Sequence, residues 1–578
     1  MCGDKSRVKS MEGRSRMEVQ EKRSFLAMYD VRGIQDYIFR TNKMQEIIGA
    51  SRLVENIIIE GLDKIIANNQ WNKEFYLTHW EEDEPDAFLR REAVRMQVLF
   101  IGGGNAYVLF REEETLRKVN RALARYVLEE TYSLNLAVAV VEKTEDYKKD
   151  YDEIQQRMRD IKSGMPETKP TGAMPFMSTD SITGYPLTQK IWLDKDKAEY
   201  VCTESALKRK SFNAWEKKER GEDCPDKEIA RNAEKILDNM VTEKGDSSHL
   251  AVVHIDGNNM GARIKAIMEK EHDYGRAITT MRMISRNIQY SFQDTFNEMG
   301  RAIDAVSDQI KSDCRGRLYR EIVVAGDDIT FVCNARAAIY AVDVFLKSIG
   351  NKIMFQEENI SEEENRRRYG FSACAGIAYF NSHFPFVDAY KVAEECCSNA
   401  KSVAKNRENR DGGIAEGNIG SYFDYQICST VRAADLKDYR MKHYLTPDKS
   451  SMLQRPYYVP CQAYEGIMDL NSRNDKRSIG ILWKCLQFFQ EGDESGNMTR
   501  SRAKKLRNAF ALGKDEVEKY CTFLLSRDVD FPNDMPEKCF WYDALEIMDF
   551  CLAVNTRQNK EDEQDREADS AGAGRMEG

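Results

Sequence analysis

A predicted β-hairpin at residues 319–334 constrains the fold of this chain more than any other stretch. An apolar run leads into Gly326, Asp327 and Asp328, and a second β-prone run, residues 329–332, follows at once, which predicts strand, tight turn and strand. Adjacent carboxylates repel each other unless a cation lies beside them, so this acidic pair indicates a hard metal ion such as Mg²⁺. A plain surface turn is the alternative, because Gly-Asp is common at turns.

A further acidic residue occurs upstream, where residues 249–260 predict a buried strand that ends at Asp256. Its carboxylate can converge with the two hairpin acids on a pair of metal ions, as two-metal nucleotidyl transfer requires. Downstream, residues 371–380 predict another strand, and the following helix places Lys401 and Lys405 on one face. Strand, helices, hairpin, helix, strand and helix is the order of a ferredoxin-like palm domain.

The same order of elements is predicted earlier in the chain. A strand ending at Asp30 and two helices precede a strand, glycine turn and strand at residues 96–110, and a helix, strand and helix follow. Asp30 and Gly104 are 74 residues apart (104 − 30), close to the 71 residues (327 − 256) between Asp256 and Asp327. Order and spacing agree, which indicates an internal repeat.

The first copy lacks the hairpin acids of the second. Gly104 and Asn105 fall where the acidic pair occurs, so this copy should not hold the catalytic metals. Gly102, Gly103 and Gly104 would let the backbone come close to a phosphate or a base. A glycine-rich hairpin without a functional role is the alternative.

Several stretches resemble a known family. IDGNNMG, VVAGDDITFV and SACAGIAYFNSHFP...AYKVAEECCSNAKSVAK resemble the second palm of the large subunit of type III CRISPR effector complexes. YDVRGIQDYIFRTNKMQEIIGASRLVE resembles its degenerate first palm. That family makes cyclic oligoadenylates from ATP, its hairpin motif is Gly-Gly-Asp-Asp, and its palm is similar to those of GGDEF diguanylate cyclases. Two positions differ here: Ala325 replaces the first motif glycine, and Asn258 stands where an Asp often follows the first acid.

The resemblance implies a nucleotidyltransferase that uses ATP and two Mg²⁺ or Mn²⁺ ions to make a cyclic or linear oligonucleotide, an oligoadenylate second messenger of antiviral defence. Asp256, Asp327 and Asp328 would be the catalytic and metal-binding residues. The predicted nucleotide-binding residues are Gly257, Asn258, Asn259, Gly326, Lys401, Lys405, Gly102, Gly103 and Gly104. Nucleotides, guide or target RNA and other CRISPR effector subunits are the expected partners.

The expected fold class is α/β (α+β): two ferredoxin-like palms packed as a pseudo-dimer, with a helical linker region and a C-terminal α-helical domain. The predicted divisions are a flexible tail (1–23), a degenerate palm (24–162), a linker (163–245), a catalytic palm (246–425), a helical domain (426–557) and a disordered tail (558–578). Within them we expect turns at 171–187, a solvated loop at 356–368 and helical structure at 500–527.

The linker region contains two stretches that bear on zinc and RNA binding. The family often carries a zinc knuckle here, but Ser178 and Ser181 occupy the cysteine positions and hydroxyls are poor zinc ligands, so no zinc is expected. Lys208, Arg209 and Lys210 form a basic cluster that could face RNA, although a solvated helix face is the favoured interpretation.

Composition excludes several other classes of protein. The length of 578 residues predicts about three or four domains, and the net charge of −10 argues against a protein that coats nucleic acid indiscriminately. Fourteen scattered cysteines, without a secretory signal or long apolar span, indicate a cytoplasmic protein that does not enter a membrane. The six dispersed histidines argue against HD-nuclease chemistry, and we expect the family's N-terminal HD domain to be missing because the first palm begins almost at once.

Two alternatives remain open from the sequence. A palm pair that binds nucleotide or RNA without turnover is compatible with Ala325 and Asn258. A cyclic-dinucleotide synthase that acts alone is the other alternative. The acids favour an enzyme, and the double palm favours the CRISPR-like family.

Overall fold

The computed structural model describes residues 23–102, 104–165, 172–192, 198–220, 229, 235–241, 248–310, 318–410, 420–428, 436–460, 477–492 and 496–552. Gly103, nearly all of the predicted N-terminal tail and the whole predicted C-terminal tail lie outside these residues.

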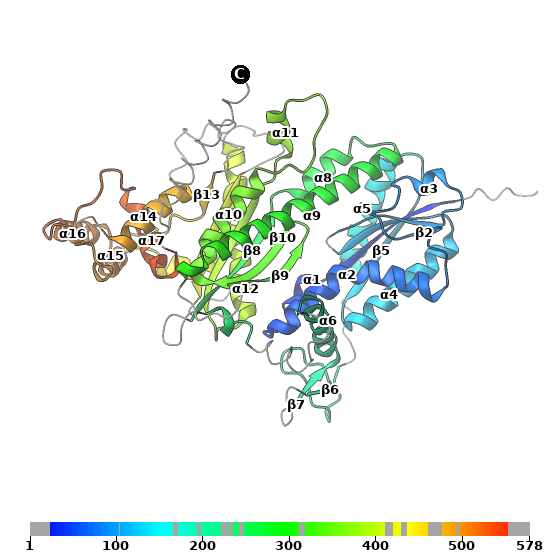
Figure 1. Cartoon of the computed structure of the whole chain (residues 1–578), viewed down its shortest axis with the longest axis horizontal. Coiled ribbons are helices and arrows are strands. Elements are labelled where there is room, and N and C mark those ends of the chain that lie inside the picture. Colours follow the sequence, from blue (N-terminus) through cyan, green and yellow to red (C-terminus); the bar gives the residue numbers. More distant parts are fainter. Residues whose placement is uncertain are drawn as a thin grey trace, which may run out of the picture.

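An N-terminal unit is built on a five-stranded sheet of order β2-β3-β4-β1-β5. Its elements are β1 (Phe25–Arg32), α1 (Ile34–Ile38), α2 (Met44–Asn68), β2 (Tyr76–Leu77), α3 (Ala87–Arg90), β3 (Met96–Gly102), β4 (Asn105–Phe110), α4 (Glu113–Thr131), β5 (Asn135–Glu142) and α5 (Tyr147–Gly164). The strands are almost fully buried, and α2 buries apolar side chains at helical spacing, such as Val54, Ile58 and Leu62. This unit occupies the blue and cyan side of the molecule (Figure 1).

A central unit is built on a six-stranded sheet of order β13-β12-β11-β8-β10-β9. Its elements are β8 (His249–Gly257), α8 (Met260–Met268), α9 (Tyr274–Ala305), β9 (Tyr319–Ala325), β10 (Asp328–Asn334), α10 (Ala338–Gly350), α11 (Glu362–Tyr369), β11 (Ala373–Asn381), α12 (Phe386–Arg410), β12 (Ser421–Cys428) and β13 (Tyr457–Val459). β12 crosses the predicted boundary at residue 425, and β13 adds a strand from beyond it.

The two sheets have matching registers at their central hairpins. In the N-terminal unit Asp30 of β1 lies opposite Asn105 of β4. In the central unit Asp256 of β8 lies opposite Asp328 of β10. The internal repeat predicted from order and spacing is therefore confirmed in the strand register, and Asn105 does stand where the second copy has an acid.

The two units contact each other reciprocally through their first long helices. Arg282 of α9 donates to the main-chain carbonyls of Leu99 and Val98 on β3, at 2.8 and 3.0 Å. Arg52 of α2 pairs with Glu321 on β9. Both arginines come eight positions after the first residue of their helix (52 − 44 and 282 − 274). Each unit thus presents the same helix position to the same hairpin strand of the other unit.

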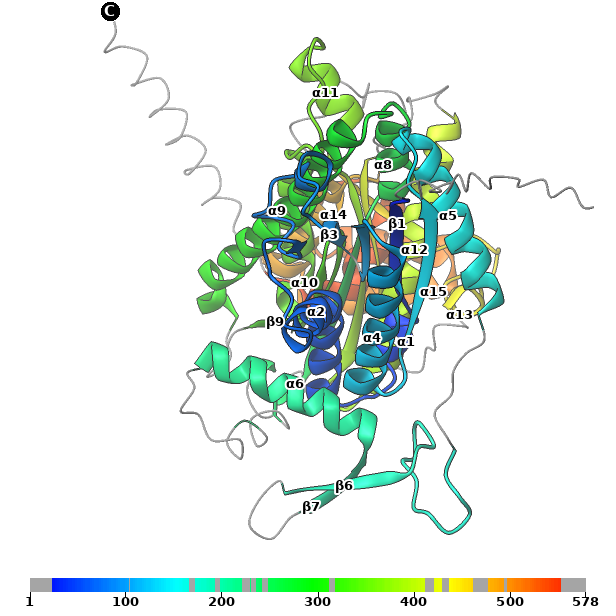
Figure 2. The same ribbon diagram turned by 90° about the vertical axis from the view of Figure 1, so that its right-hand side faces the viewer.

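The connecting region contains a hairpin that the sequence did not predict. β6 (Leu187–Trp192) and β7 (Ala198–Cys202) pair antiparallel and project from the body beside α6 (Thr203–Arg220) (Figure 2). The basic cluster on α6 is not a solvated or RNA-facing surface at two of its three positions. Lys208 is buried against Glu204 and the Tyr37 carbonyl, both at 2.7 Å, and Arg209 is also buried. Both basic residues attach α6 to the N-terminal unit.

The described residues from 436 onward are mainly helical, apart from β13. They contain α13 (Leu436–His443), α14 (Ile479–Glu491), α15 (Arg500–Leu512), α16 (Lys514–Leu525) and α17 (Trp541–Ile547), with short 3-10 turns η7 (Lys538–Phe540) and η8 (Met548–Phe550). The other 3-10 turns are η1 (Asp238–Met240), η2 (Ser307–Gln309) and η3 (Ala335–Ala337). Arg455 is buried between Asp543 and Glu546, at 3.2 and 2.6 Å, and this charged cluster holds α17 against the central unit.

Among the helices that the structure describes, none is both long and apolar enough to cross a membrane.

Candidate functional site

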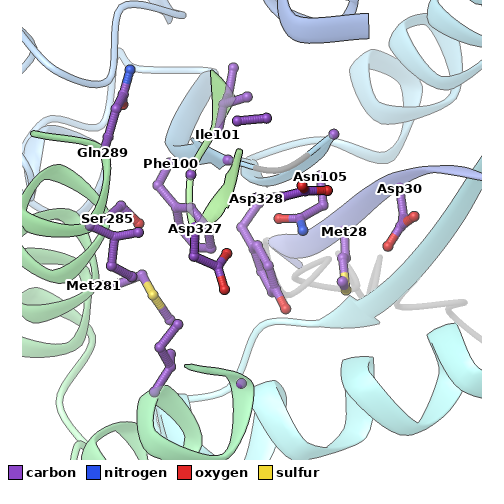
Figure 3. Close-up of a pocket in the computed structure, with 18 of the residues that line it drawn as sticks. Met28, Asp30, Phe100, Ile101, Asn105, Met281, Ser285, Gln289, Asp327 and Asp328 are labelled. Carbon is purple, nitrogen blue, oxygen red and sulfur yellow. The ribbon is translucent and has the colours of Figure 1, made fainter. Parts of the chain in front are cut away.

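A pocket of about 1280 Å³ lies between the N-terminal and central units. The two hairpins identified from the sequence face it: Gly102, Gly104 and Asn105 line it from one unit, and Gly326, Asp327 and Asp328 line it from the other. Figure 3 shows Asp327 and Asp328 between side chains of α9, such as Met281 and Ser285, and the Met28 and Asp30 side chains of β1. The pocket is therefore shared by both copies of the repeat.

The hairpin of the central unit depends on one glycine for its turn. Gly326 has φ +63°, and a Cβ atom there would meet open space, so the backbone conformation and not the available room selects glycine. Ala325 pairs with Asp328 as the last residue of β9. Because strand conformation suits alanine, the change from the family's Gly-Gly-Asp-Asp motif at Ala325 leaves this turn intact.

The three predicted acids are close neighbours at the end of the central hairpin. Asp256 and Asp328 are cross-strand partners, so their side chains share one face of the sheet. The main-chain N–H of Gly257 donates to the Asp327 carbonyl at 3.2 Å. A Cβ atom at Gly257 would lie 2.9 Å from Asp327 Oδ2 and 2.8 Å from Met260 Cγ. Gly257 is thus required by a close approach of the Asp327 side chain.

Burial and mutual repulsion perturb these carboxyls. Burial against the pocket wall, followed by the neighbouring Asp256 carboxylate, raises the pKa values of Asp327 and Asp328 to about 7. Burial lowers the pKa of His254, whose Nδ1 lies 3.5 Å from Asp328 Oδ1. His254 therefore does not neutralise the acids at neutral pH. Among the described residues Asp328 Oδ1 is buried without a hydrogen-bond partner.

Lys401 of α12 neutralises one of the acids. Its ammonium group forms an ion pair with the Asp256 carboxylate and donates to the Gly257 carbonyl at 3.3 Å. Burial opposes the charged form, but Asp256 more than compensates and raises the pKa of Lys401. Lys405, one turn further along α12, is exposed. The structure therefore places Lys401, and not Lys405, at the acids.

The side chains around the acids only partly match a site for the predicted metal ions. Among the described residues no three His, Cys, Asp or Glu side chains are arranged to hold one ion, and Asp256 is occupied by Lys401. The chemistry nonetheless suits a cation, because Asp328 Oδ1 lacks a partner and two neighbouring carboxyls have raised pKa values. The metal pair remains a prediction that the donor types support.

Two predicted nucleotide-binding residues, Asn258 and Asn259, have structural roles next to the acids. Asn258 is buried, and its amide donates to Ser372 Oγ at 3.1 Å and to the Gly420 carbonyl at 2.9 Å. Asn259 has a left-handed φ of 54° and begins α8. The Asn258 amide therefore bonds to the protein itself, and this geometry does not support the predicted contact between Asn258 and a nucleotide.

The glycines of the N-terminal hairpin differ from each other. Gly104 has φ +80°, and a Cβ atom there would lie 2.4 Å from Ile34 Cδ1. Gly102 is exposed, and a Cβ atom there would meet nothing within 4 Å. The fold therefore requires glycine at position 104. At position 102, which borders the pocket, the fold would also accept a side chain.

The sequence did not point to Lys162 of the N-terminal unit as the partner of Asp30. Lys162 of α5 donates to Asp30 Oδ2 at 2.5 Å, and both line the pocket. Asp30 is the register equivalent of Asp256. Extending the repeat alignment from the strands to the last helix of each copy would have matched Lys162 with Lys401.

Comparison with known proteins identifies the central unit. Residues 249–412 match the family model of the Cas10/Cmr2 second palm domain. This segment is similar to the Cas10/Cmr2 second palm domain, and we refer to it as the second palm. The matched range contains the three acids and both lysines, so the resemblance found in the sequence is confirmed for the second palm.

Solved structures similar to the chain as a whole have low sequence identity to it. Csm1 of T. onnurineus is 13% identical with a TM-score of 0.43, covering 92% of this chain and 70% of its own. An apo Csm1–Csm4 cassette is 13% identical with a TM-score of 0.44, covering 95% and 72%. A Csm1–Csm4 cassette in complex with cA4 is 13% identical with a TM-score of 0.42, covering 93% and 70%. No curated protein matches the sequence.

Proposed function

We propose that this chain is a nucleotidyltransferase that binds ATP with Mg²⁺ or Mn²⁺ between its two halves and forms phosphodiester bonds. The product would be a cyclic or linear oligonucleotide, in particular an oligoadenylate signal. The observation that carries this proposal is the shared pocket, which has the acids of the second palm on one side and the glycine hairpin of the N-terminal unit on the other. The Cas10/Cmr2 match supports the same chemistry.

The architecture proposed for this function is a pseudo-dimer of two ferredoxin-like palms. The strand orders β3-β4-β1-β5 and β9-β10-β8-β11 agree element by element. The contacts of Arg52 with β9 and of Arg282 with β3 are reciprocal, as contacts across a twofold axis are. The domain divisions predicted from the sequence are kept within this proposal, including a first palm at 24–162.

The residues of the chain would divide the chemistry among them. Asp256, Asp327 and Asp328 would hold the divalent ions, which when bound lower the pKa of an attacking 3′-hydroxyl and stabilise the pyrophosphate leaving group. Lys401 would supply positive charge to the triphosphate. The backbone at Gly102 would let a second nucleotide approach closely, so that one nucleotide lies on each palm.

The test is incubation with each labelled nucleoside triphosphate and Mg²⁺ or Mn²⁺, followed by mass identification of products. We expect an adenylate product from the wild-type chain and none from the Asp327→Asn, Asp328→Asn double variant. Wild-type-like product from that variant would contradict the assignment of the acids. The same variant keeps the shape of the carboxyls, so loss of product would not reflect lost packing.

A nucleotide-binding subunit without turnover is the second candidate. It is favoured by Asn258, which stands where an Asp often follows the first acid and whose amide donates to Ser372 Oγ and to the Gly420 carbonyl. ATP binding in the pocket without product from any nucleotide would support it. Measuring both binding and product on one preparation separates the two candidates.

We also propose that the chain acts with other CRISPR effector subunits and with guide or target RNA in antiviral defence. The Cas10/Cmr2 match supports this context. One similar structure is a Csm1–Csm4 subcomplex of a type III-A CRISPR-Csm interference complex. Co-expression with a Csm4-type subunit and mass measurement of the purified particle would test it.

A further inference from the structure

Each palm pairs an aspartate at the end of its first strand with a lysine from its last helix. In the second palm Lys401 of α12 pairs with Asp256, and in the N-terminal unit Lys162 of α5 pairs with Asp30 at 2.5 Å. Both lysines come 15 positions after the first residue of their helix (401 − 386 and 162 − 147). The ion pair is therefore part of the repeated architecture.

The surroundings of the two ion pairs differ. Asp30 of β1 lies opposite the neutral Asn105 of β4, so Lys162 balances the single acid of this strand pair. Asp256 lies opposite Asp328, and Asp327 is next to it. One lysine there faces three carboxyl groups, which leaves an excess of negative charge at the second palm when the acids are ionised.

We propose that Lys401 is an exchangeable counter-ion, which occupies the cation position at Asp256 in the free chain and moves to the nucleotide phosphates when a divalent cation binds that carboxylate. This inference rests on the proposed function, because the incoming ligand is the metal-bound nucleotide. It goes beyond that function by giving Lys401 a second state in which it competes with the metal. Lys162 has no such competitor and stays paired.

The structure gives Lys401 the properties that this exchange requires. Its side chain is 21% exposed and that of Asp256 is 38% exposed, so the ammonium group can leave without becoming buried and unpaired. A lysine carries its charge on a flexible four-carbon stem. An ammonium group and a divalent cation attracted to one carboxylate compete for its oxygens, because each repels the other.

The experiment compares Lys401→Met, Lys401→Arg and Lys162→Met with the wild-type chain. Mn²⁺ binding without nucleotide is measured by electron paramagnetic resonance of the free ion. ATP binding is measured by calorimetry at saturating Mg²⁺, with an ATP analogue that cannot release pyrophosphate. Lys401→Met should bind Mn²⁺ about fivefold more tightly, because an ion pair worth up to about 1 kcal/mol no longer competes. The same variant should bind ATP roughly tenfold more weakly, because a charge-assisted phosphate contact is lost.

The controls separate exchange from a general change in charge. Lys162→Met removes one positive charge at the equivalent position and should leave Mn²⁺ binding at the wild-type value. Lys401→Arg should restore weak Mn²⁺ binding, since the guanidinium also pairs with a carboxylate. In an Asp256→Asn background, Lys401→Met should no longer tighten Mn²⁺ binding.

Unchanged or weaker Mn²⁺ binding by Lys401→Met would overturn the exchange, as would an equal gain in Lys162→Met or no Mn²⁺ binding by any variant. None of these readouts depends on product formation. If the opposite effects on Mn²⁺ and ATP are observed but no nucleotide yields product, the exchange stands and the proposed transferase activity fails.

Discussion

Arg282 of α9 donates to the main-chain carbonyl of Leu99, 2.8 Å away on β3 of the other half of the molecule. The same guanidinium reaches the Val98 carbonyl at 3.0 Å and the Asp83 carbonyl at 2.6 Å. Burial lowers the pKa of Arg282 to about 10, which leaves it charged at neutral pH. One buried side chain therefore satisfies three carbonyls across the boundary that forms the pocket.

Replacing this arginine should loosen the pairing of the two halves. We expect Arg282→Met to lower the free energy of unfolding by about 3 kcal/mol, because buried carbonyls lose charge-assisted hydrogen bonds. Urea denaturation measures the change. Arg276→Met, on the same helix but 77% exposed, is the matched control and should change stability by less than about 0.5 kcal/mol. Equal effects of the two variants would show that the Arg282 contacts contribute nothing specific.

The acids of the second palm should make stability depend on pH in the absence of metal. The folded-state pKa of Asp327 is raised to about 7, above the value of about 3.9 for an unfolded aspartate. Between these values the folded chain binds more protons than the unfolded chain, so stability falls as pH rises through this window. Asp327→Asn removes that penalty.

In EDTA, Asp327→Asn should therefore gain stability over the wild type as pH increases from 5 to 8. The gain should be about 1 kcal/mol, reduced by solvent screening because the carboxyl is only partly buried. Unfolding measured at several pH values in this range checks the trend. A constant difference between variant and wild type would show that Asp327 ionises normally in the folded chain.

The sequence predicted the elements that carry the chemistry because their signals are local. Asp256 ends an apolar run and Gly326 precedes two acids, and the structure places both at the predicted strand end and turn. The repeat was found because order and spacing survive the loss of the acids from the first hairpin. Strand register follows from the same alternation of buried and exposed residues.

Residues whose roles depend on tertiary contacts were not found. Arg52, Arg282 and Lys208 are charged helix residues, and sequence patterns place such residues on the surface. The structure buries Arg282 and Lys208 because carbonyl or carboxylate partners come from distant segments. The residues next to Arg282 and Lys208 in the sequence do not indicate these distant carbonyl and carboxylate partners.

Local helix signals were also incomplete at two places. The predicted loop at 356–368 contains α11, which is capped by Ser361 and supported by an ion pair between Glu362 and Arg366. The helical stretch predicted at 500–527 forms two helices, which are divided at Gly513, where φ is 112°. The high charge of residues 356–368 favoured a loop over α11. The helical periodicity continues across Gly513, so it did not indicate where the first of the two helices ends.

A side chain at Gly257 should displace the Asp327 carboxyl. A Cβ atom would lie 2.9 Å from Asp327 Oδ2 and 2.8 Å from Met260 Cγ, so Gly257→Ala must displace the acid or the helix that follows. We expect a loss of stability of about 1–3 kcal/mol. If the proposed transferase activity holds, turnover should fall roughly a hundredfold, because a carboxyl of the proposed metal site is misplaced. Gly480→Ala is the control, since its nearest atom lies at an ordinary 3.6 Å. Wild-type turnover by Gly257→Ala would show that Asp327 need not hold its present position.

The glycine hairpin of the N-terminal unit should contact a nucleotide through Gly102. Gly104 is unsuited to the test, because φ +80° and the 2.4 Å approach to Ile34 make Gly104→Val destabilising by about 1–2 kcal/mol whatever its function. Gly102 ends a strand and has open space on the pocket side. Gly102→Val should therefore keep the stability of the wild type to within about 0.5 kcal/mol. It should weaken ATP binding and turnover roughly tenfold, since the side chain would extend into the shared pocket. Normal ATP binding and product formation by a stable Gly102→Val chain would mean that the first hairpin only supports the second palm.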